Sequence, residues 1–261
     1  MTRLPVVPSK QLGQHFLVDE NILGVIGRLA HLGPEDVVLE VGPGLGVLTA
    51  FLADHVALVH AVELDASLEA HLRDRLGARE NVRLVVGDAL RIDLSALRPE
   101  PTKLVSNLPY NVATPLVVEC LERLATVQHF CVMVQREVAD RFFASPGTKA
   151  YGAVSVLVQL QAERTGFHPV SRTVFRPRPR VESALVAFRR LDPPPGYARV
   201  KRVVEAGFAH RRKTLPNSLE LAGLVSRARA VEALAVVGRP AATRAESLAP
   251  AELVRLADLL A

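Results

Sequence analysis

The sequence alternates short apolar runs with amphipathic segments through most of its length, and this alternation constrains the fold more than any other feature. Runs rich in β-branched residues have the length of strands at 37–41, 57–62, 82–86, 104–106 and 130–134. Between them, apolar residues recur at helical spacing in segments 45–53, 66–76, 115–124 and 136–143. Because neighbouring parallel strands are joined by crossover helices, the alternation predicts an α/β fold with a mostly parallel, doubly wound sheet.

The pattern changes in the last third of the chain. Two apolar runs, 156–161 and 184–188, follow without a long helical pattern between them, so we expect an antiparallel hairpin at the edge of the sheet. Three prolines and a glycine at 193–196 then interrupt any regular element. Helical periodicity resumes at 200–208, 215–221, 229–236 and 250–260. We therefore predict a first domain at 1–192 and a small helical domain at 197–261.

Composition excludes several classes of protein. With 49% hydrophobic and 23% charged residues, the chain is not intrinsically disordered. Charged residues within the first thirty positions argue against a secretory signal, and no apolar run is long enough to span a membrane. The two cysteines, Cys120 and Cys131, are too few for a disulfide framework or a zinc site. We expect a cytoplasmic protein with no metal and no membrane contact.

Positive charge is concentrated in one part of the chain. The whole sequence has a net charge of +5, yet residues 171–213 hold twelve basic and three acidic residues, a local balance of +9. A bias toward arginine, which supplies 27 of the 32 basic residues, explains the residue type but not the clustering. The clustering indicates a polyanionic partner. The candidate phosphate contacts are Arg176, Arg178, Arg180, Arg211, Arg212 and Lys213, with Lys10 near the N-terminus.

Acidic residues and glycines follow the predicted strands where a nucleoside cofactor would bind. The first strand leads into Gly42-Pro43-Gly44, whose glycines permit a sharp turn close to a ligand. Glu63 ends the second strand, where a carboxylate accepts hydrogen bonds from ribose hydroxyls, and Asp88 follows the third. Because all three strand ends share the carboxyl edge of the sheet, they predict one site. Two cofactors fit it, a nicotinamide dinucleotide or S-adenosylmethionine.

The segment Asn107-Leu108-Pro109-Tyr110 after the fourth strand favours S-adenosylmethionine. Adenine N6 is a poor nucleophile because its lone pair is delocalised into the ring. Acceptors on the Asn107 side-chain oxygen and the Pro109 carbonyl would hold the two amine hydrogens and stabilise the positive charge that develops on nitrogen. Tyr110 would stack on the base and align it with the methyl group. These residues predict methyl transfer to an exocyclic amine.

From end to end the chain resembles the ribosomal small-subunit adenine dimethyltransferases, the KsgA family. The motifs that carry the resemblance are GQHFL at 13–17, EVGPG at 40–44, ELD at 63–65, NLPY at 107–110, KAYG at 149–152, FRPRPRVES at 175–183 and RRKT at 211–214 with NSL at 217–219. The resemblance implies a class I, Rossmann-like methyltransferase domain followed by a small C-terminal helical domain.

The resemblance also implies roles for individual residues. The cofactor, S-adenosylmethionine with S-adenosylhomocysteine as product, would be contacted by His15, Leu17, Gly42, Gly44, Glu63, Asp88, Ala89 and Asn107. Phe175 would stack on the target adenine from the face opposite Tyr110. Many family members have Asn where this chain has His15. The expected catalytic residues are Asn107, Pro109, Tyr110 and Phe175.

The family's substrate is a pair of adjacent adenosines in a hairpin loop near the 3′ end of 16S rRNA, each of which receives two methyl groups. The alternative is the related methyltransferase of 23S rRNA that confers macrolide resistance. Those relatives usually have isoleucine where this chain has Leu108 and lack the block at 211–219, so we favour the small-subunit substrate. We expect a monomer that acts on small-subunit rRNA within an assembling ribosomal particle.

Two alternative functions, each from a different class of protein, are also compatible with parts of the sequence. The glycine turn and Glu63 alone also suit an NAD-dependent oxidoreductase, although that reading leaves the Asn107–Tyr110 segment unexplained. The protein is alternatively a ribosome assembly factor whose binding matters more than its chemistry. The order and timing of the methylations do not follow from the sequence.

Overall fold

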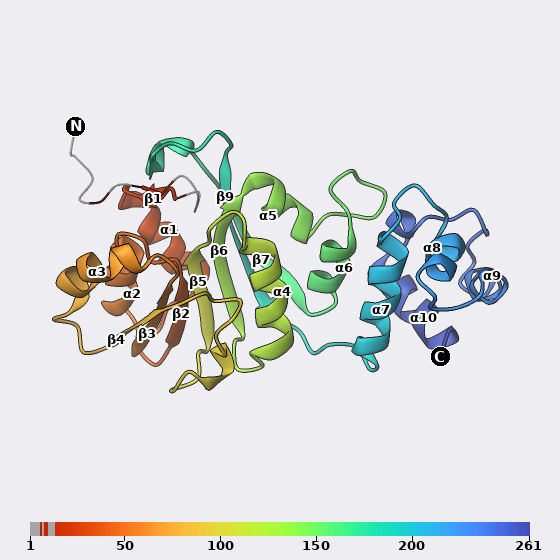
Figure 1. Ribbon diagram of the computed structural model, residues 1–261, viewed down its shortest axis with the longest axis horizontal. Helices are drawn as coiled ribbons and strands as arrows, with labels where there is room; N and C mark the ends of the chain where they lie inside the picture. The colour runs from red at the N-terminus through yellow and green to blue at the C-terminus, as the bar shows by residue number, and fades with distance from the viewer. Residues whose placement is uncertain (1–5, 7, 10–13) are drawn as a thin grey trace. The chain divides into compact units, whose positions relative to one another are not determined.

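The structure is a computed structural model that describes residues 6, 8–9 and 14–261. The chain divides into two compact units, each described here by itself. The first comprises Met1–Ala139 and Glu163–Arg190, and the second comprises Asp140–Ala162 and Leu191–Ala261. Figure 1 labels the elements of both units.

A seven-stranded sheet in the order β4-β3-β2-β5-β6-β9-β7 forms the centre of the first unit. Its strands are β2 (Val37–Val41), β3 (Leu58–Glu63), β4 (Val82–Val86), β5 (Lys103–Asn107), β6 (His129–Gln135), β7 (Ala162–Val170) and β9 (Ser183–Arg190). The pairs from β4 to β6 are parallel, whereas β9 runs antiparallel to β6, with Val186 opposite Val132. The predicted α/β class, the parallel sheet and its antiparallel edge are confirmed.

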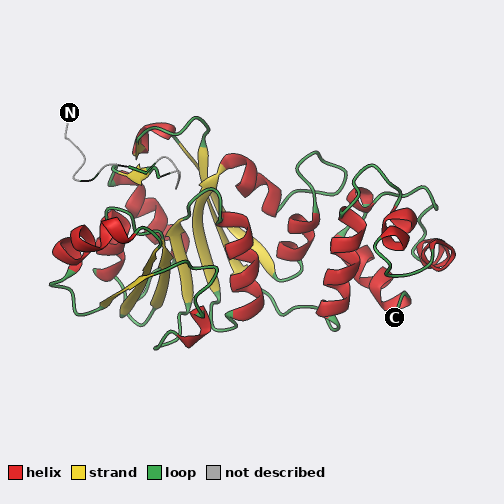
Figure 2. Cartoon of the chain, viewed as in Figure 1, coloured by secondary structure: helices red, strands yellow, loops and turns green. Residues whose placement is uncertain are grey.

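Helices flank the sheet on both faces (Figure 2). They are α1 (Asn21–Ala30), which precedes β2, and α2 (Val47–Ala53), α3 (Glu69–Leu76), α4 (Ala113–Arg123) and α5 (Arg136–Phe142), which follow strands of the sheet. Short 3₁₀ turns are η1 (Ala66–Leu68), η2 (Leu94–Ala96) and η3 (Arg172–Val174). Arg190 at the end of β9 ties the sheet to α4, because its guanidinium donates to the carbonyls of Leu121 and Leu124, each at 2.7–2.8 Å. Those carbonyls lack partners within the helix.

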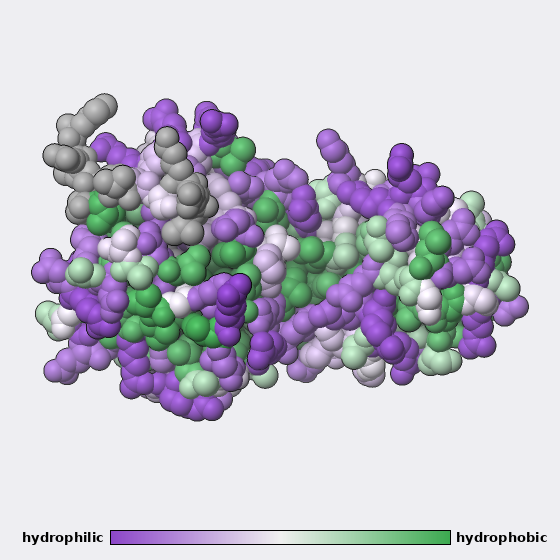
Figure 3. All heavy atoms as spheres, viewed as in Figure 1, coloured by the Kyte–Doolittle hydropathy of each residue, from purple (hydrophilic) through white to green (hydrophobic). Residues whose placement is uncertain are grey.

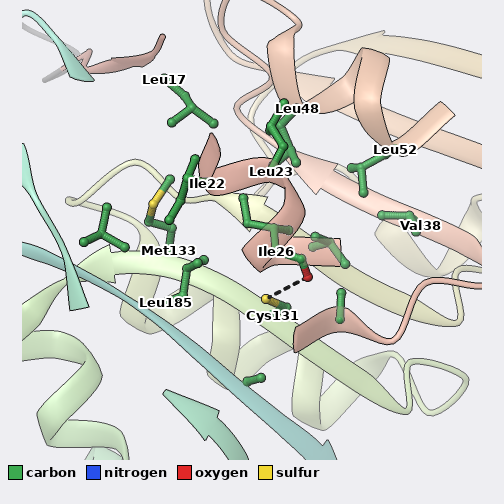
Figure 4. Close-up of a cluster of buried hydrophobic side chains, with 14 of the residues drawn as sticks. Leu17, Ile22, Leu23, Ile26, Val38, Leu48, Leu52, Cys131, Met133 and Leu185 are labelled. Carbon is green, nitrogen blue, oxygen red and sulfur yellow. Dashed lines mark hydrogen bonds between the residues drawn. The ribbon is translucent and has the colours of Figure 1, made fainter. Parts of the chain in front are cut away.

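The apolar face of α1 supplies much of the core. Figure 4 shows Ile22 and Ile26 packed against Cys131 and Met133 of β6 and Leu185 of β9. These side chains alternate along the strands, as a sheet face requires. Burial raises the pKa of the Cys131 thiol to about 12, so it stays protonated and packs as an apolar side chain.

A second, two-stranded sheet joins the N-terminal segment to a loop far along the chain. In it β1 (Phe16–Leu17) pairs antiparallel with β8 (Phe175–Arg176), which places Phe16 opposite Arg176 and Leu17 opposite Phe175. The amide of Val18 extends the pairing with a 2.9 Å bond to the Val174 carbonyl. Sequence patterns do not predict this sheet, because two-residue strands have no periodicity.

The structure corrects the sequence-based description of residues 140–162. The run 156–161, expected as a strand, lies largely in helix α6 (Ala153–Gln159), and the edge strand is the following segment, β7. Val156 and Val158 are both fully buried, and the run of β-branched residues in this short helix is typical of a strand. The segment also packs with the second unit, although we assigned it to the domain at 1–192.

The second unit is helical, with α6, α7 (Tyr197–Phe208), α8 (Leu215–Leu221), α9 (Arg227–Val236), the 3₁₀ turn η4 (Ala245–Ser247) and α10 (Pro250–Leu259). Tyr151, from the KAYG motif, is fully buried in its core. The Tyr151 hydroxyl donates to the Leu248 carbonyl at 2.7 Å, and its ring meets Phe208 edge-on. This motif therefore stabilises the second unit.

Hydrophilic side chains cover most of the visible surface of each unit (Figure 3). Among the described residues, no helix is both long and apolar enough to cross a membrane.

Candidate functional site

A cleft lies at the carboxyl ends of β2, β3, β4 and β5. Open α/β sheets bind ligands at this edge. Of the residues expected to contact cofactor or base, it is lined by His15, Leu17, Gly42, Gly44, Glu63, Asp88, Ala89, Asn107, Pro109 and Tyr110. The fold thus gathers segments that are far apart in the sequence.

The two glycines after β2 are required by contacts within the protein. Both have positive φ angles, +78° at Gly42 and +58° at Gly44. A Cβ atom on Gly42 would lie 3.2 Å from the Pro109 ring, and one on Gly44 would lie 2.9 Å from the Phe16 ring. The glycines therefore let the Asn107–Tyr110 segment and the N-terminal segment close around the cleft.

Glu63 and Asp88 present carboxylates to the cleft from neighbouring strands. Glu63 is 5% exposed, and its oxygens accept the backbone amides of Gly44 at 3.0 Å and Asp65 at 2.9 Å. Burial raises the pKa of Glu63, although these amides oppose the rise. Asp88 caps the following turn through the Leu90 amide at 3.0 Å. Both carboxylates keep lone pairs for a nucleoside.

Sequence reasoning assigned no role to Glu40, which also lines the cleft. It is 1% exposed, and its Oε2 atom has no hydrogen-bond partner in the described part of the chain. Burial raises the pKa of Glu40 to about 8. The signal in the sequence was an acid inside an otherwise apolar strand.

A buried carboxyl oxygen without a protein partner can accept a hydrogen bond from a ligand, and a cationic group beside it would favour its charged form. S-adenosylmethionine carries an ammonium and a sulfonium group, which Glu40 would face, and a nucleoside, which Glu63 and Asp88 would hold. The residues of the cleft therefore fit this cofactor. By contrast, the described residues contain no group of three or more His, Cys, Asp or Glu side chains that would hold a metal ion.

Asn107 ends β5 with its amide oriented by the N-terminal segment. Its Nδ2 atom donates to the His15 carbonyl at 3.4 Å, which leaves Oδ1 as an acceptor. The Pro109 carbonyl, the second expected acceptor, already accepts the amides of Val112 and Ala113, each at 3.1 Å, where α4 begins. No described residue donates to the Leu108 carbonyl. The Leu108 carbonyl, one residue earlier than the expected acceptor, thus has no partner among the described residues, whereas the Pro109 carbonyl has two.

Tyr110 is half-buried and is held from two sides. Its hydroxyl hydrogen-bonds to the Ser183 hydroxyl on β9 at 2.8 Å. The ring also contacts the imidazole of His15, with centroids 5.7 Å apart and planes inclined by 34°. Burial raises the pKa of Tyr110, so the phenol stays neutral. Two anchors of this kind fix the plane of the ring.

The N-terminal segment is fastened to the end of β3. The Gln14 side chain donates to the Asp65 carboxylate at 2.7 Å. Leu17 is 6% exposed and packs into the core while also lining the cleft. Lys10 lies outside the described residues.

Phe175 is the exception among the expected site residues. It is 2% exposed, packs in the core with Leu17 and does not line the cleft, so its ring is not available for stacking in this structure. The sequence did not reveal this because the pairing of β1 with β8, which buries the ring, is a long-range contact. Arg176 at the end of β8 is exposed, as are Arg178 and Arg180 on the loop that follows.

The other basic cluster lies in the second unit, between α7 and α8. Arg211 pairs with Glu246 at 3.5 Å. Arg212 and Lys213 are exposed, and no carboxylate among the described residues lies within ion-pair distance of either. The two basic clusters therefore lie in different units.

Known proteins resemble this chain over most of its length. The family model described as "Ribosomal RNA adenine dimethylase" matches residues 8–261. A protein of Rubrobacter xylanophilus named "Ribosomal RNA small subunit methyltransferase A" is 50% identical over 95% of this chain and 94% of its own. One of the same name from Thermobifida fusca is 44% identical over 98% of this chain and 91% of its own.

Solved structures show the same fold. A dimethyladenosine transferase from Plasmodium falciparum superimposes with a TM-score of 0.76, covering 93% of this chain and 96% of that one, at 21% identity. The 23S rRNA methyltransferase ErmE superimposes with a TM-score of 0.69, covering 94% and 99%, at 30% identity. With a model match across nearly its whole length, the chain belongs to the ribosomal RNA adenine dimethylase family of S-adenosylmethionine-dependent methyltransferases.

Proposed function

We propose that this protein dimethylates the N6 amines of two adjacent adenosines in the 3′-terminal hairpin loop of 16S rRNA. The observation that carries the proposal is the pair of acceptors, Asn107 Oδ1 and the Leu108 carbonyl, beside a cleft that fits S-adenosylmethionine. The names of the relatives from Rubrobacter and Thermobifida support the small subunit as the target.

The chain's own residues would organise the amine and the base. When bound, S-adenosylmethionine supplies an electrophilic methyl group. Asn107 Oδ1 and the Leu108 carbonyl would accept the two N6 hydrogens, which favours a nitrogen lone pair directed away from the ring and stabilises positive charge on it. Tyr110 would stack on the adenine, held by Ser183 and His15. The methylated amine is acidic enough to lose its proton without a strong base.

Three acidic side chains of the cleft would contact different parts of the cofactor. Glu63 would accept hydrogen bonds from the ribose hydroxyls, and Asp88 would accept one from the adenine amine, with Ala89 also in contact with the adenine. Glu40 would face the cationic methionine end. Stacking by Phe175 would require its ring to leave the core, so we propose Tyr110 as the primary stacking partner.

The arginines at 176, 178 and 180, together with Arg212 and Lys213, would contact phosphates around a target adenine that leaves its stack. An unpaired loop adenine is the least costly target, because no base pair is broken. We propose that the protein acts in the cytoplasm, as a monomer, on an assembling small-subunit particle.

The similarity to ErmE makes 23S rRNA the second candidate substrate. The test is methyl transfer from labelled S-adenosylmethionine to small-subunit particles that lack the two dimethyladenosines, to fully methylated particles, and to 23S rRNA, with modified bases mapped. We expect label at two adjacent adenosines of the undermethylated particles only. Label confined to 23S rRNA would refute the small-subunit assignment, and transfer to none would refute the proposed activity.

A further inference from the structure

We propose, resting on the function proposed above, that His15 is a positioning residue that couples RNA contact at the arginine segment 176–180 to the orientation of Asn107 and Tyr110. A single residue of the N-terminal segment touches all three parts. Its imidazole bonds to the arginine segment, its ring contacts Tyr110 and its carbonyl accepts the Asn107 amide.

The bond to the arginine segment is the strongest of these contacts. The His15 Nδ1 atom lies 2.7 Å from the Pro177 carbonyl, between two of the exposed arginines. Next to it, Phe16 and Leu17 pair with Arg176 and Phe175 in the β1–β8 sheet. Residues 15–18 and 174–177 therefore form one hydrogen-bonded piece, and a displacement of either strand is passed to the other.

The contacts toward the reacting base are the adjustable ones. The bond from Asn107 Nδ2 to the His15 carbonyl is 3.4 Å long, beyond the usual range of 2.7–3.2 Å, so a small shift of the His15 backbone would strengthen it. Hydrogen bonds of catalytic groups are often long before substrate binds and tighten in the complex. Tyr110 is anchored on its other side by Ser183, so a shift of the imidazole changes the tilt of the ring.

The arginine segment is placed to receive the RNA. Arg176, Arg178 and Arg180 are exposed, while Pro179 between them is buried and Arg172 is paired with Glu182 at 2.9 Å. A phosphate that binds the arginines would act on a segment fixed at its base and joined to His15. Asn107 and Tyr110 would thereby be aligned with the target base only when RNA phosphates occupy the arginine segment.

Three substitutions test whether His15 acts through its hydrogen bond to the Pro177 carbonyl or only through the packing of its ring. His15→Phe keeps a ring beside Tyr110 but has no atom to bond the Pro177 carbonyl. His15→Asn keeps a donor, and is the conservative variant for rescue. The matched control is His55→Phe, because His55 also bonds a backbone carbonyl, that of Phe51 at 2.8 Å, and contacts an aromatic ring, yet lies outside the cleft.

We expect His15→Phe to slow single-turnover methyl transfer to undermethylated small-subunit particles on the order of tenfold, with the rate restored by His15→Asn and unchanged in the control. Affinity for S-adenosylhomocysteine, measured by calorimetry, should fall by less than the rate does, because His15 is only one of the residues that line the cleft. When Arg176, Arg178 and Arg180 are all changed to Gln, adding His15→Phe should cause no further loss of rate at saturating particle, because the coupling is already broken.

Hydrogen exchange gives a readout independent of methyl transfer. Adding an RNA hairpin with unpaired loop adenines should slow exchange at 174–180 and at 107–112 in the wild type, but only at 174–180 in His15→Phe. The proposal would be overturned if protection never reached 107–112, or if the rates fell multiplicatively in the combined variant. It would also be overturned if His15→Phe lowered cofactor affinity as much as it lowered the rate. If no variant transfers methyl groups, the proposed function fails, while the exchange result still decides the coupling.

Discussion

The buried carboxyl group of Glu40 predicts a distinctive dependence of stability on pH. Its pKa rises from 4.5 to about 8 because burial disfavours the charged form. The folded protein therefore binds this proton more tightly than the unfolded chain does. The stability this contributes is present below pH 4.5 and is lost as the pH rises toward 8. Each pKa unit corresponds to about 1.4 kcal/mol, so the whole loss is roughly 5 kcal/mol, of which about 4 kcal/mol falls between pH 5 and pH 8.5.

The substitution Glu40→Gln isolates this contribution, because the amide has nearly the same shape and does not titrate. A buried amide without a full set of partners costs about 1–3 kcal/mol at every pH. We therefore expect the variant to be less stable than the wild type at pH 5 and more stable, by about 2 kcal/mol, at pH 8.5. The two stability curves should cross between these values.

The assay is urea unfolding followed by circular dichroism between pH 5 and pH 8.5, without cofactor. Glu63, whose pKa is also raised, gives both proteins a residual slope of the same sign, so the difference between them is the quantity to measure. Glu80→Gln, at an exposed position, is the control and should leave the curve unchanged. Parallel curves for Glu40→Gln and wild type would refute the reasoning, since they would mean that Glu40 is ionised or solvated in the folded state.

Three further predictions concern the proposed site. Asn107→Ala should abolish methyl transfer while calorimetric affinity for S-adenosylhomocysteine stays within a few-fold; near wild-type transfer would exclude Asn107 as the amine acceptor. Gly44→Ala places a Cβ 2.9 Å from Phe16 at a φ of +58°, so we expect a loss of about 1–3 kcal/mol in urea unfolding together with weaker cofactor binding, and an unchanged melt would contradict the close packing. Changing Arg212 and Lys213 to Gln should lower the slope of log affinity for RNA against log salt by about 1.4–1.8, and adding Arg211→Gln should lower it by less, because Arg211 is paired with Glu246. Equal decrements for all three would contradict the role of that pair.

The sheet and the position of the cleft followed from local patterns. The run at 37–41 matches β2 residue for residue, and those at 82–86 and 130–134 fall within or on β4 and β6. Because strands and helices differ in the spacing of their apolar residues, these strands could be predicted from their own residues. The pattern failed at 156–161, because three of the seven residues of α6 are valines, which are typical of strands, and α1 was not identified.

Several properties of the site depend on contacts between residues distant in sequence. The proposed use of the Leu108 carbonyl rather than that of Pro109 depends on which backbone groups the start of α4 occupies, and the burial of Phe175 depends on the pairing of β1 with β8. The raised pKa of Glu40 likewise reflects the packing around it.

Residue types and their order were therefore sufficient for the fold class, the family resemblance and the chemistry of an amine methyltransferase. Those conclusions rest on side-chain periodicity and on functional groups that are local in the chain. The tertiary structure alone decided how His15 connects Pro177 with Asn107 and Tyr110, across 162 positions of sequence for the first contact. Hydrogen bonding and burial depend on distances of a few ångströms, and those distances exist only once the chain has folded.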